Sequence, residues 1–286
     1  MSRARLSIRI LITGLLLVLG WQALTNLNNW RAKFADSNFQ ANSIRLQAYY
    51  LDQPAPIILA GSSVTARLDP SYFSETQTPQ VANLGLDGCV VAFSLEVAAG
   101  RPVSGKCVLV ENYSLLINET SNEKSIQSII SGAALRLPRH LGAFRAHIRP
   151  TALIYSELKK RKDRSGGVPG KKLLVARKMA DLTPAEIAVL DRSRTAIAQL
   201  RKLGARVVLL RLPYGETEGP ASERELDYFT EFAAELNAPE IDLPSLMRAK
   251  GIELRYSDGL HMVAPTAKEA SRILGEELSS LLEKSG

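Results

Sequence analysis

Short apolar segments recur along this chain and are separated by longer stretches of mixed polarity. Five of them have the length expected of strands buried on both faces of a parallel sheet. They cover residues 57–60, 81–84, 108–110, 207–210 and 241–243. This pattern restricts the fold more than any other feature of the sequence, because parallel strands need crossover connections that cover the faces of the sheet.

The stretches between these segments carry helical signals. Pro184–Leu203 ends before Gly204, and both this stretch and Pro265–Glu283 open with proline, which is favoured in a first helical turn. Cys89–Gly100 and Ser222–Leu236 also fit helices. Strands that alternate with helices predict an α/β protein, a three-layer α/β/α sandwich with a mainly parallel, flavodoxin-like sheet.

The first 30 residues form a separate apolar region. Residues 10–30 carry no formal charge, and a helix of this length, at about 1.5 Å per residue, spans the roughly 30 Å hydrocarbon core of a bilayer. Arg3, Arg5 and Arg9 precede the region. The positive-inside rule therefore predicts an N-terminal transmembrane helix acting as a signal anchor, with the N-terminus in the cytoplasm and the rest extracytoplasmic, in the periplasm.

Two other interpretations of this region stay open. A cleaved signal peptide fits the apolar length, but its best cleavage site follows Ala23 and has the bulky Trp21 two positions earlier, where a small residue is preferred. A buried N-terminal helix of a soluble protein is the third interpretation. In an uncleaved anchor, Trp21 and Trp30 would lie at the outer membrane interface.

The basic residues are concentrated in one segment. The chain has 36 Lys and Arg against 29 Asp and Glu, a net charge of +7, and 13 of these cations lie in residues 136–178 beside only Glu157 and Asp163. Such a segment either binds an anionic glycan or lipid surface or is a solvated positive face. From residue 147 onward its only aromatic residue is Tyr155, and with an extracytoplasmic location this argues against nucleic acid as a partner.

These features predict three regions along the chain. They are an anchor at residues 1–30, a linker with a short helix at 31–52, and an α/β domain at 53–286 with a basic helical insertion at about 114–183. Cys89 and Cys107 are expected at opposite ends of one layer, about 18 Å apart and too far for a disulfide, so we expect two buried thiols. The chain has no CxxC or Cys/His cluster, so we predict no metal and no cofactor.

A serine follows the first predicted strand directly. Gly61, Ser62 and Ser63 stand where this strand would turn into a helix, and open α/β sheets keep their sites at the carboxyl ends of strands. Gly61 permits a sharp turn, and a helix beginning behind Ser63 would offer N–H groups to an oxyanion. The structural alternative for Ser63 is a helix N-cap.

Asp258 and His261 stand three residues apart in a DGLH sequence before the last predicted helix. A carboxylate at this spacing can accept a hydrogen bond from Nδ1 of the histidine and leave Nε2 to take a proton from a serine. The other two histidines, His140 and His147, lie in the basic segment. We therefore predict Ser63, His261 and Asp258 as a catalytic triad, with a chance DxxH and a structural histidine as the alternatives.

The sequence NLGLDG, residues 83–88, ends the second predicted strand. Gly85 there could bring a backbone N–H to the same point as Ser63, because no side chain blocks the approach. Alternatively, these glycines only fit the backbone of a loop. An α/β-hydrolase elbow fits less well, because GxSxG would need a glycine at Thr65.

These motifs resemble the blocks of the SGNH, or GDSL-like, hydrolases. The matching blocks are GSS, NLGLDG and DGLH, and the resemblance covers residues 57–112 and about 205–283. It implies that Ser63 is the nucleophile and that the N–H groups of Ser63 and Gly85 line an oxyanion hole. The third block of the family, GxND, is matched only by Asn112, whose side-chain amide would be the third oxyanion donor.

The sequence GSS in place of GDS resembles the membrane-anchored, envelope-modifying branch, which includes alginate O-acetylation proteins and the D-alanyl transfer protein of teichoic acid synthesis. This likeness implies a serine esterase or O-acyltransferase that acts on acetyl esters of a cell-envelope polysaccharide through an acyl-serine. The expected partners are an acylated glycan or small acyl ester, the membrane, and a membrane acyltransferase. A non-catalytic SGNH-like binding or scaffold protein is the alternative.

Overall fold

The computed structural model describes residues 3–28, 32, 35, 37–76, 80–117, 122–162, 178–213 and 228–283. The chain divides into two compact units, one of residues 1–47 and 125–164 and one of residues 48–124 and 165–286. Trp30, most of the predicted loop in the basic segment and the first part of predicted helix Ser222–Leu236 lie outside the described residues.

A five-stranded parallel sheet forms the centre of the second unit. Its strands lie in the order β2-β1-β3-β4-β5, and every neighbouring pair is parallel. The strands are β1 Ile57–Gly61, β2 Val81–Gly85, β3 Cys107–Glu111, β4 Arg206–Arg211 and β5 Glu240–Asp242. All five were predicted from the sequence, and no boundary differs by more than one residue.

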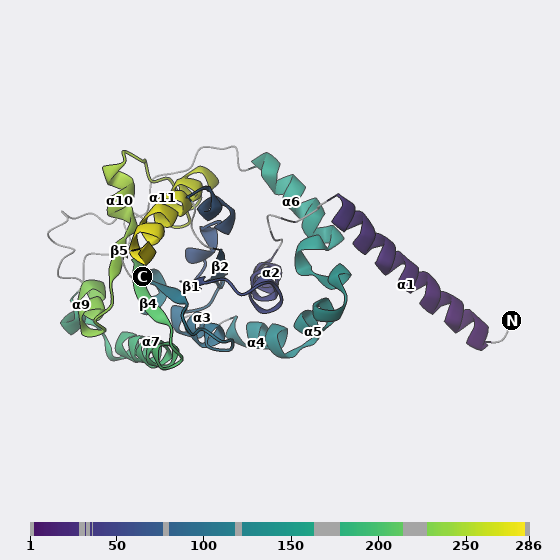
Figure 1. Cartoon of the computed structure of the whole chain (residues 1–286), viewed down its shortest axis with the longest axis horizontal. Coiled ribbons are helices and arrows are strands. Elements are labelled where there is room, and N and C mark those ends of the chain that lie inside the picture. Colours follow the sequence, from purple (N-terminus) through teal and green to yellow (C-terminus); the bar gives the residue numbers. More distant parts are fainter. Residues whose placement is uncertain are drawn as a thin grey trace. The chain divides into compact units, whose positions relative to one another are not determined.

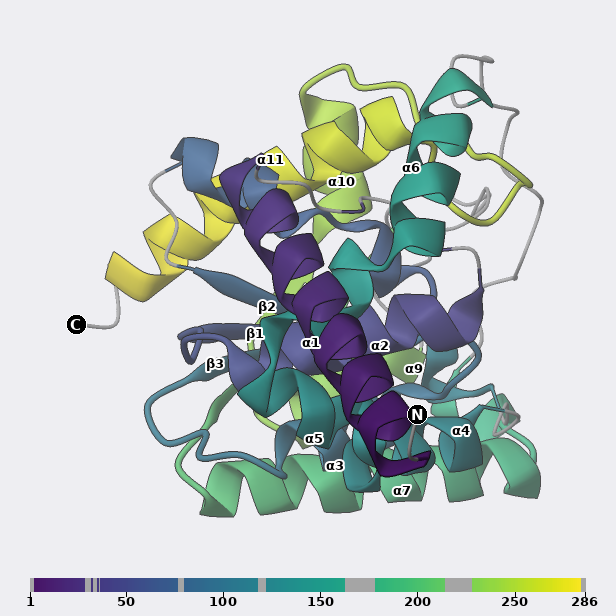
Figure 2. The ribbon, with the colours of Figure 1, turned by 90° about the vertical axis from the view of Figure 1, so that its right-hand side faces the viewer.

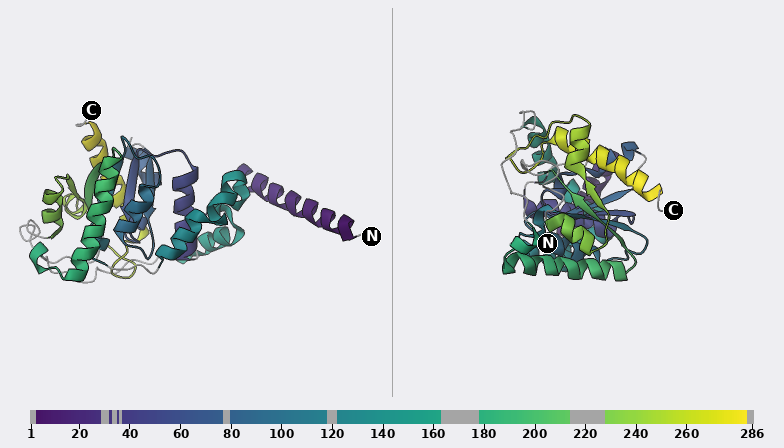
Figure 3. Two further views of the ribbon diagram at one scale, coloured as in Figure 1. Left: turned by 90° about the horizontal axis from the view of Figure 1, so that it is seen from below. Right: turned by 90° about the vertical axis from the view of Figure 1, so that its left-hand side faces the viewer.

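Helices cover both faces of this sheet (Figures 1 and 3). One face carries α3 Val91–Ala98 and α7 Pro184–Lys202, and the other carries α10 Leu243–Ala249 and α11 Ala264–Glu283. The predicted three-layer α/β/α fold is therefore confirmed. The short α10 was not predicted, and the described part of predicted helix Ser222–Leu236 is α9, Tyr228–Glu235.

Side chains that alternate between the two faces of the sheet build the core. Leu59, Leu109 and Leu210 point to one face and share an apolar cluster with Ile273 and Leu274 of α11. Their neighbours, such as Ile58 and Val108, point to the other face and are also buried and apolar, as expected of central parallel strands. This packing holds the carboxyl ends of β1, β2 and β3 at one edge of the sheet.

The first unit is helical (Figure 2). Its helices are α1 Arg3–Leu27, α5 Ala133–His140 and α6 Pro150–Lys162, together with most of α2 Asn38–Leu51 and α4 Glu123–Ser131. An 18-residue stretch within residues 5–27 of α1 has a mean hydropathy of 1.8, and this helix is long and apolar enough to cross a membrane, as predicted.

Residues 136–164 of the basic segment group with the N-terminal helices. Residues 125–164 belong to the same unit as residues 1–47, whereas the sequence was interpreted as one α/β domain carrying an insertion at about 114–183. Gln47 near the end of α2 links the two parts, because its Nε2 donates to Ala134 O at 2.6 Å and its Oε1 accepts from Ala146 N at 2.7 Å. These long-range contacts carry no signal in sequence periodicity.

The two cysteines are both buried thiols, as predicted. Cys107 begins β3, and Cys89 lies just before α3. Burial raises the pKa of the Cys107 thiol to about 11. This thiol is therefore protonated at neutral pH and contributes to the core as a small apolar side chain.

Candidate active site

The turn after β1 presents Ser63 at the carboxyl edge of the sheet. It continues into a short 3-10 helix, η1 Thr65–Arg67, and not into the longer helix expected from the sequence. The Val64 N–H donates to Ser62 Oγ at 3.3 Å, and the Thr65 N–H donates to Glu111 at 3.2 Å. The predicted set of open N–H groups behind Ser63 is therefore wrong, because these two donors already have acceptors.

Ser63 is the first member of a continuous chain of hydrogen bonds. Its Oγ lies 2.9 Å from Nε2 of His261, and Nδ1 of His261 lies 2.7 Å from Oδ2 of Asp258. A carboxylate at Nδ1 stabilises the tautomer with a proton on that nitrogen. Nε2 is then the acceptor for the Ser63 hydroxyl proton. The structure thus brings together the three residues that the sequence predicted as a triad.

The neighbouring Ser62 occupies a different environment. Its side chain is buried with 4% of its surface exposed, and its Oγ accepts the Val64 N–H. Ser63 is partly exposed and reaches the His261 ring. Of the two adjacent serines, only Ser63 is therefore placed to react with a molecule from solvent.

A closed loop holds His261 and Asp258. An isolated bridge pairs the fully buried Tyr256 with Met262, and the Ser257 N–H donates to His261 O at 2.7 Å. Gly259 at the turn has φ +83°, a left-handed conformation that glycine adopts at little cost. The buried tyrosine anchors the loop to the core, so the imidazole and its carboxylate are positioned together.

Hydrogen bonds favour the charged form of the Asp258 carboxyl. Partial burial raises its pKa, but the backbone N–H of His261, its ring and the N–H of Leu260 together outweigh this effect and lower the pKa from 3.8 to about 2. The two N–H groups lie 2.8 and 3.0 Å from Oδ1. Asp258 is therefore ionised at neutral pH and can stabilise a protonated His261.

Glu111, at the end of β3, is a site residue that the sequence analysis missed. It is fully buried, and one carboxylate oxygen accepts the Ser62 N–H and the Ser114 hydroxyl, each at 2.7 Å. The other oxygen accepts the N–H and the hydroxyl of Thr65. Glu111 therefore fastens both ends of the Ser63 turn to the adjacent strand.

Gly85 is placed close to this turn but its N–H has a partner. A Cβ at Gly85 would lie 2.2 Å from Ala66 N, so glycine is needed for the close approach. However, the Gly85 N–H donates to Asn83 Oδ1 at 2.7 Å. The sequence predicted that this N–H would face an oxyanion. In the structure it is instead bound to a side chain of the same strand.

Two other N–H groups at this edge lack such partners. Those of Ser63 and Gly88 have no acceptor in the part of the chain that the structure describes. Gly88 has φ +71° in the turn after β2 and belongs to the same NLGLDG sequence. Its position in that motif was the available signal, but the sequence does not tell which glycine leaves its N–H unpaired.

Asn112 follows β3 at the same edge and is 2% exposed. Its Oδ1 accepts the Leu212 N–H at 3.0 Å, and its backbone oxygen accepts the Tyr228 hydroxyl at 3.1 Å. These contacts join the ends of β3 and β4. They fix the orientation of the side-chain amide, whose role toward an oxyanion stays a prediction.

The described residues contain no group of three or more His, Cys, Asp or Glu side chains placed to hold a metal ion. The fold and the site together define an α/β protein with a hydrogen-bonded serine, histidine and aspartate at the edge of its sheet.

Comparisons with known proteins leave the family unassigned. No family model matches the chain, and no curated protein matches it. Among solved structures, the YxiM protein of Bacillus subtilis is similar, with a TM-score of 0.39 and 16% sequence identity. The match covers 79% of this chain and 56% of YxiM, so the chain spans little more than half of that protein's length.

Proposed function

We propose that this protein is a membrane-anchored serine esterase or O-acyltransferase of the SGNH type. The observation that carries the proposal is the unbroken chain of hydrogen bonds from Asp258 through His261 to Ser63. A serine hydroxyl is a weak nucleophile by itself and becomes reactive beside an oriented general base. The buried Glu111 supports this assignment, because it holds the turn that aims Ser63 at the base.

The chemistry follows from these positions. His261 Nε2 takes the hydroxyl proton while Ser63 Oγ attacks the carbonyl carbon of an ester, and the ionised Asp258 stabilises the imidazolium that forms. The N–H groups of Ser63 and Gly88 would donate to the oxyanion. His261 then returns the proton to the leaving alkoxide, which leaves an acyl-serine.

The second half of the reaction decides between the two activities. His261 deprotonates either water, which gives hydrolysis, or a sugar hydroxyl, which gives transfer of the acyl group. We propose acetyl as the acyl group and an envelope or extracellular polysaccharide as the glycan. A membrane acyltransferase is a candidate partner that would deliver acyl groups to the site for the transfer reaction. In this proposal the N-terminus is cytoplasmic and the α/β unit is periplasmic.

The test is labelling of the purified full chain with a fluorophosphonate, which reacts with an activated serine. Wild type should be labelled, and both Ser63→Ala and His261→Ala should abolish labelling while the circular dichroism spectrum is unchanged. Ser62→Ala is the matched control and should keep labelling, because Ser62 does not contact His261. Turnover of an acetyl ester, with and without a glycan acceptor, then separates hydrolysis from transfer.

A folded wild-type protein that stays unlabelled would contradict the proposal. It would favour the second candidate function, binding of a glycan or a partner protein without turnover. One observation points that way, because the Gly85 N–H donates to Asn83 within the protein. Binding measured for Ser63→Ala would then equal binding of wild type.

A further inference from the structure

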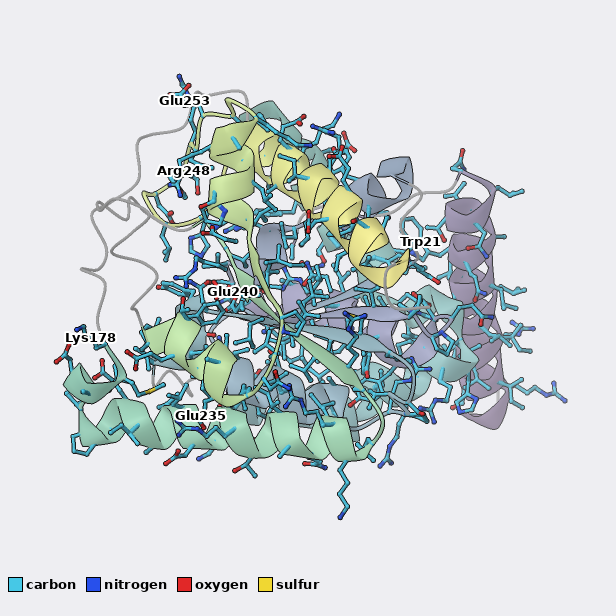
Figure 4. The ribbon with its side chains drawn as sticks, turned by 60° about the vertical axis from the view of Figure 1, so that its left-hand side comes forward. Trp21, Lys178, Glu235, Glu240, Arg248 and Glu253 are labelled. Atoms are coloured by element: carbon cyan, nitrogen blue, oxygen red, sulfur yellow. The ribbon has the colours of Figure 1, made fainter. Side chains whose placement is uncertain are left out.

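The end of α1 is built into the first unit. Trp21 Nε1 donates to Ile148 O at 3.0 Å (Trp21 is labelled in Figure 4), and Gln22 Oε1 accepts the Ala143 N–H at 3.3 Å. One turn further along, Thr25 is fully buried and its hydroxyl donates to Trp21 O at 3.0 Å. These contacts make the last turns of the apolar helix a structural part of the unit.

The segment that receives α1 leads directly into α6. After α1 the chain contacts the same segment again, because the Ala32 N–H donates to His147 O at 2.7 Å. α6 begins at Pro150, two residues after Ile148. At 3.6 residues per turn, Ile154 and Leu158 lie about one and two turns after the first residue of α6. Figure 1 shows the beginning of α6 beside this end of α1.

α6 exposes two large apolar side chains, while smaller side chains form its buried face. Ile154 and Leu158 are 62% and 57% exposed, whereas Ala152 and Ser156 are 0% and 2% exposed. Residues four apart lie on the same side of a helix, so the two large apolar side chains form a ridge that faces away from the unit. Isolated exposed leucines are common. Two large apolar side chains that are exposed together next to a candidate membrane span indicate that another molecule covers them.

The charge of the surrounding segment indicates which kind of molecule covers Ile154 and Leu158. Between Arg136 and Leu158 the sequence has four arginines and one acidic residue, Glu157. Arg136 and Arg139 are exposed, and Arg145 and Arg149 are partly exposed. Arginines next to exposed apolar side chains are typical of segments that lie at the boundary between lipid headgroups and acyl chains.

We infer that residues 136–158 form a collar, packed against the outer end of α1, that lies in the membrane interface. Ile154 and Leu158 contact acyl chains, and the arginines bind phosphates of anionic lipids. The inference requires that α1 is retained in the mature protein, because cleavage after Ala23 would remove Trp21 and Gln22. It is independent of the chemistry proposed at Ser63.

The test uses the full chain in vesicles of phosphatidylcholine and phosphatidylglycerol. Ile154→Cys and Leu158→Cys carry a nitroxide label, and access of lipid-soluble oxygen is compared with access of a water-soluble nickel chelate. Ile187→Cys on α7 is the matched control, because Ile187 is also exposed, at 39%. The native Cys89 and Cys107 are buried, and wild type exposed to the label measures any background.

Labels at 154 and 158 should lose access to the nickel chelate and gain access to oxygen, whereas the label at 187 should stay open to the chelate. Neutral vesicles of phosphatidylcholine alone should reduce the oxygen access at 154 and 158. The intact mass of the membrane-purified protein should include α1.

Equal chelate access at 154, 158 and 187 would overturn the collar. Shielding that grows with protein concentration in detergent, without vesicles, would also overturn it, because a second copy would then cover the ridge. A mature protein that begins after Ala23 would do the same. Fluorophosphonate labelling of Ser63 is measured on the same samples, so failure of the collar and failure of the proposed chemistry are seen separately.

Discussion

At the scale of single residues, Asp258 connects the orientation of His261 to the shape of its own loop. One carboxylate oxygen accepts two backbone N–H groups of the turn, and the other faces the His261 ring. The same carboxylate therefore sets the backbone conformation that places the ring and the tautomer that makes the ring a base.

The lowered pKa of Asp258 predicts a pH dependence of stability. Because the pKa is about 2 in the folded protein and near 3.8 otherwise, the hydrogen-bonded carboxylate stabilises the fold above about pH 4 and loses this effect as the pH falls toward 2. Asp258→Asn should make the free energy of unfolding less dependent on pH in this range. Urea unfolding of both proteins between pH 2 and pH 5 measures it, and identical slopes would contradict the assignment.

Glu111 predicts a second effect at this scale. Glu111→Gln replaces an acceptor by an NH₂ group that faces N–H or hydroxyl donors in a buried place, so the free energy of unfolding should fall by about 1–3 kcal/mol. Fluorophosphonate labelling of Ser63 should slow as well. Glu253→Gln is the control, because the Glu253 side chain is 72% exposed, and should change neither quantity. Unchanged labelling of a folded Glu111→Gln protein would show that the turn does not depend on this carboxylate.

At the scale of elements, the site depends on how closely β2 approaches η1. A Cβ on Gly85 would lie 2.2 Å from the backbone nitrogen of Ala66 and 2.7 Å from its Cα. Backbone atoms cannot move aside as a flexible side chain can. The strand can therefore lie this close to the serine turn only because residue 85 is a glycine and has no Cβ.

Gly85→Ala should consequently separate β2 from η1, lower the free energy of unfolding by about 1–3 kcal/mol or more, and reduce labelling of Ser63. Gly105→Ala serves as the comparison. Gly105 has φ +71° but nothing within 4 Å of an added Cβ, so it should lose only about 1–2 kcal/mol and keep normal labelling. Equal losses in both variants, measured by urea unfolding, would argue against the close contact.

The elements also show what the sequence could and could not predict. The strands were predictable because a segment buried on both faces must be apolar throughout, as Ile57–Ala60 is. The DGLH spacing was informative because its contacts are local. Glu111 was missed because its partners, Ser62 and Thr65, lie 49 and 46 positions away along the chain. The partner of the Gly85 N–H depended on a side-chain orientation that spacing does not determine.

At the scale of the whole molecule, each of the two units is built from two stretches that are separated in the sequence. The α/β unit is assembled from two stretches with the pattern typical of strands and helices. The helical unit joins the N-terminal span to the basic segment more than a hundred residues later, as in the contact of Trp21 with Ile148. Sequence periodicity finds elements, but it does not show which distant helices pack together.

The separation of 198 positions between Ser63 and His261 also has a kinetic meaning. Contacts that close long loops are costly in chain entropy and tend to form late in folding. Under the proposed function, Ser63 would become reactive only after the 256–262 loop has docked. The rate of fluorophosphonate labelling during refolding would therefore report when this long-range contact forms.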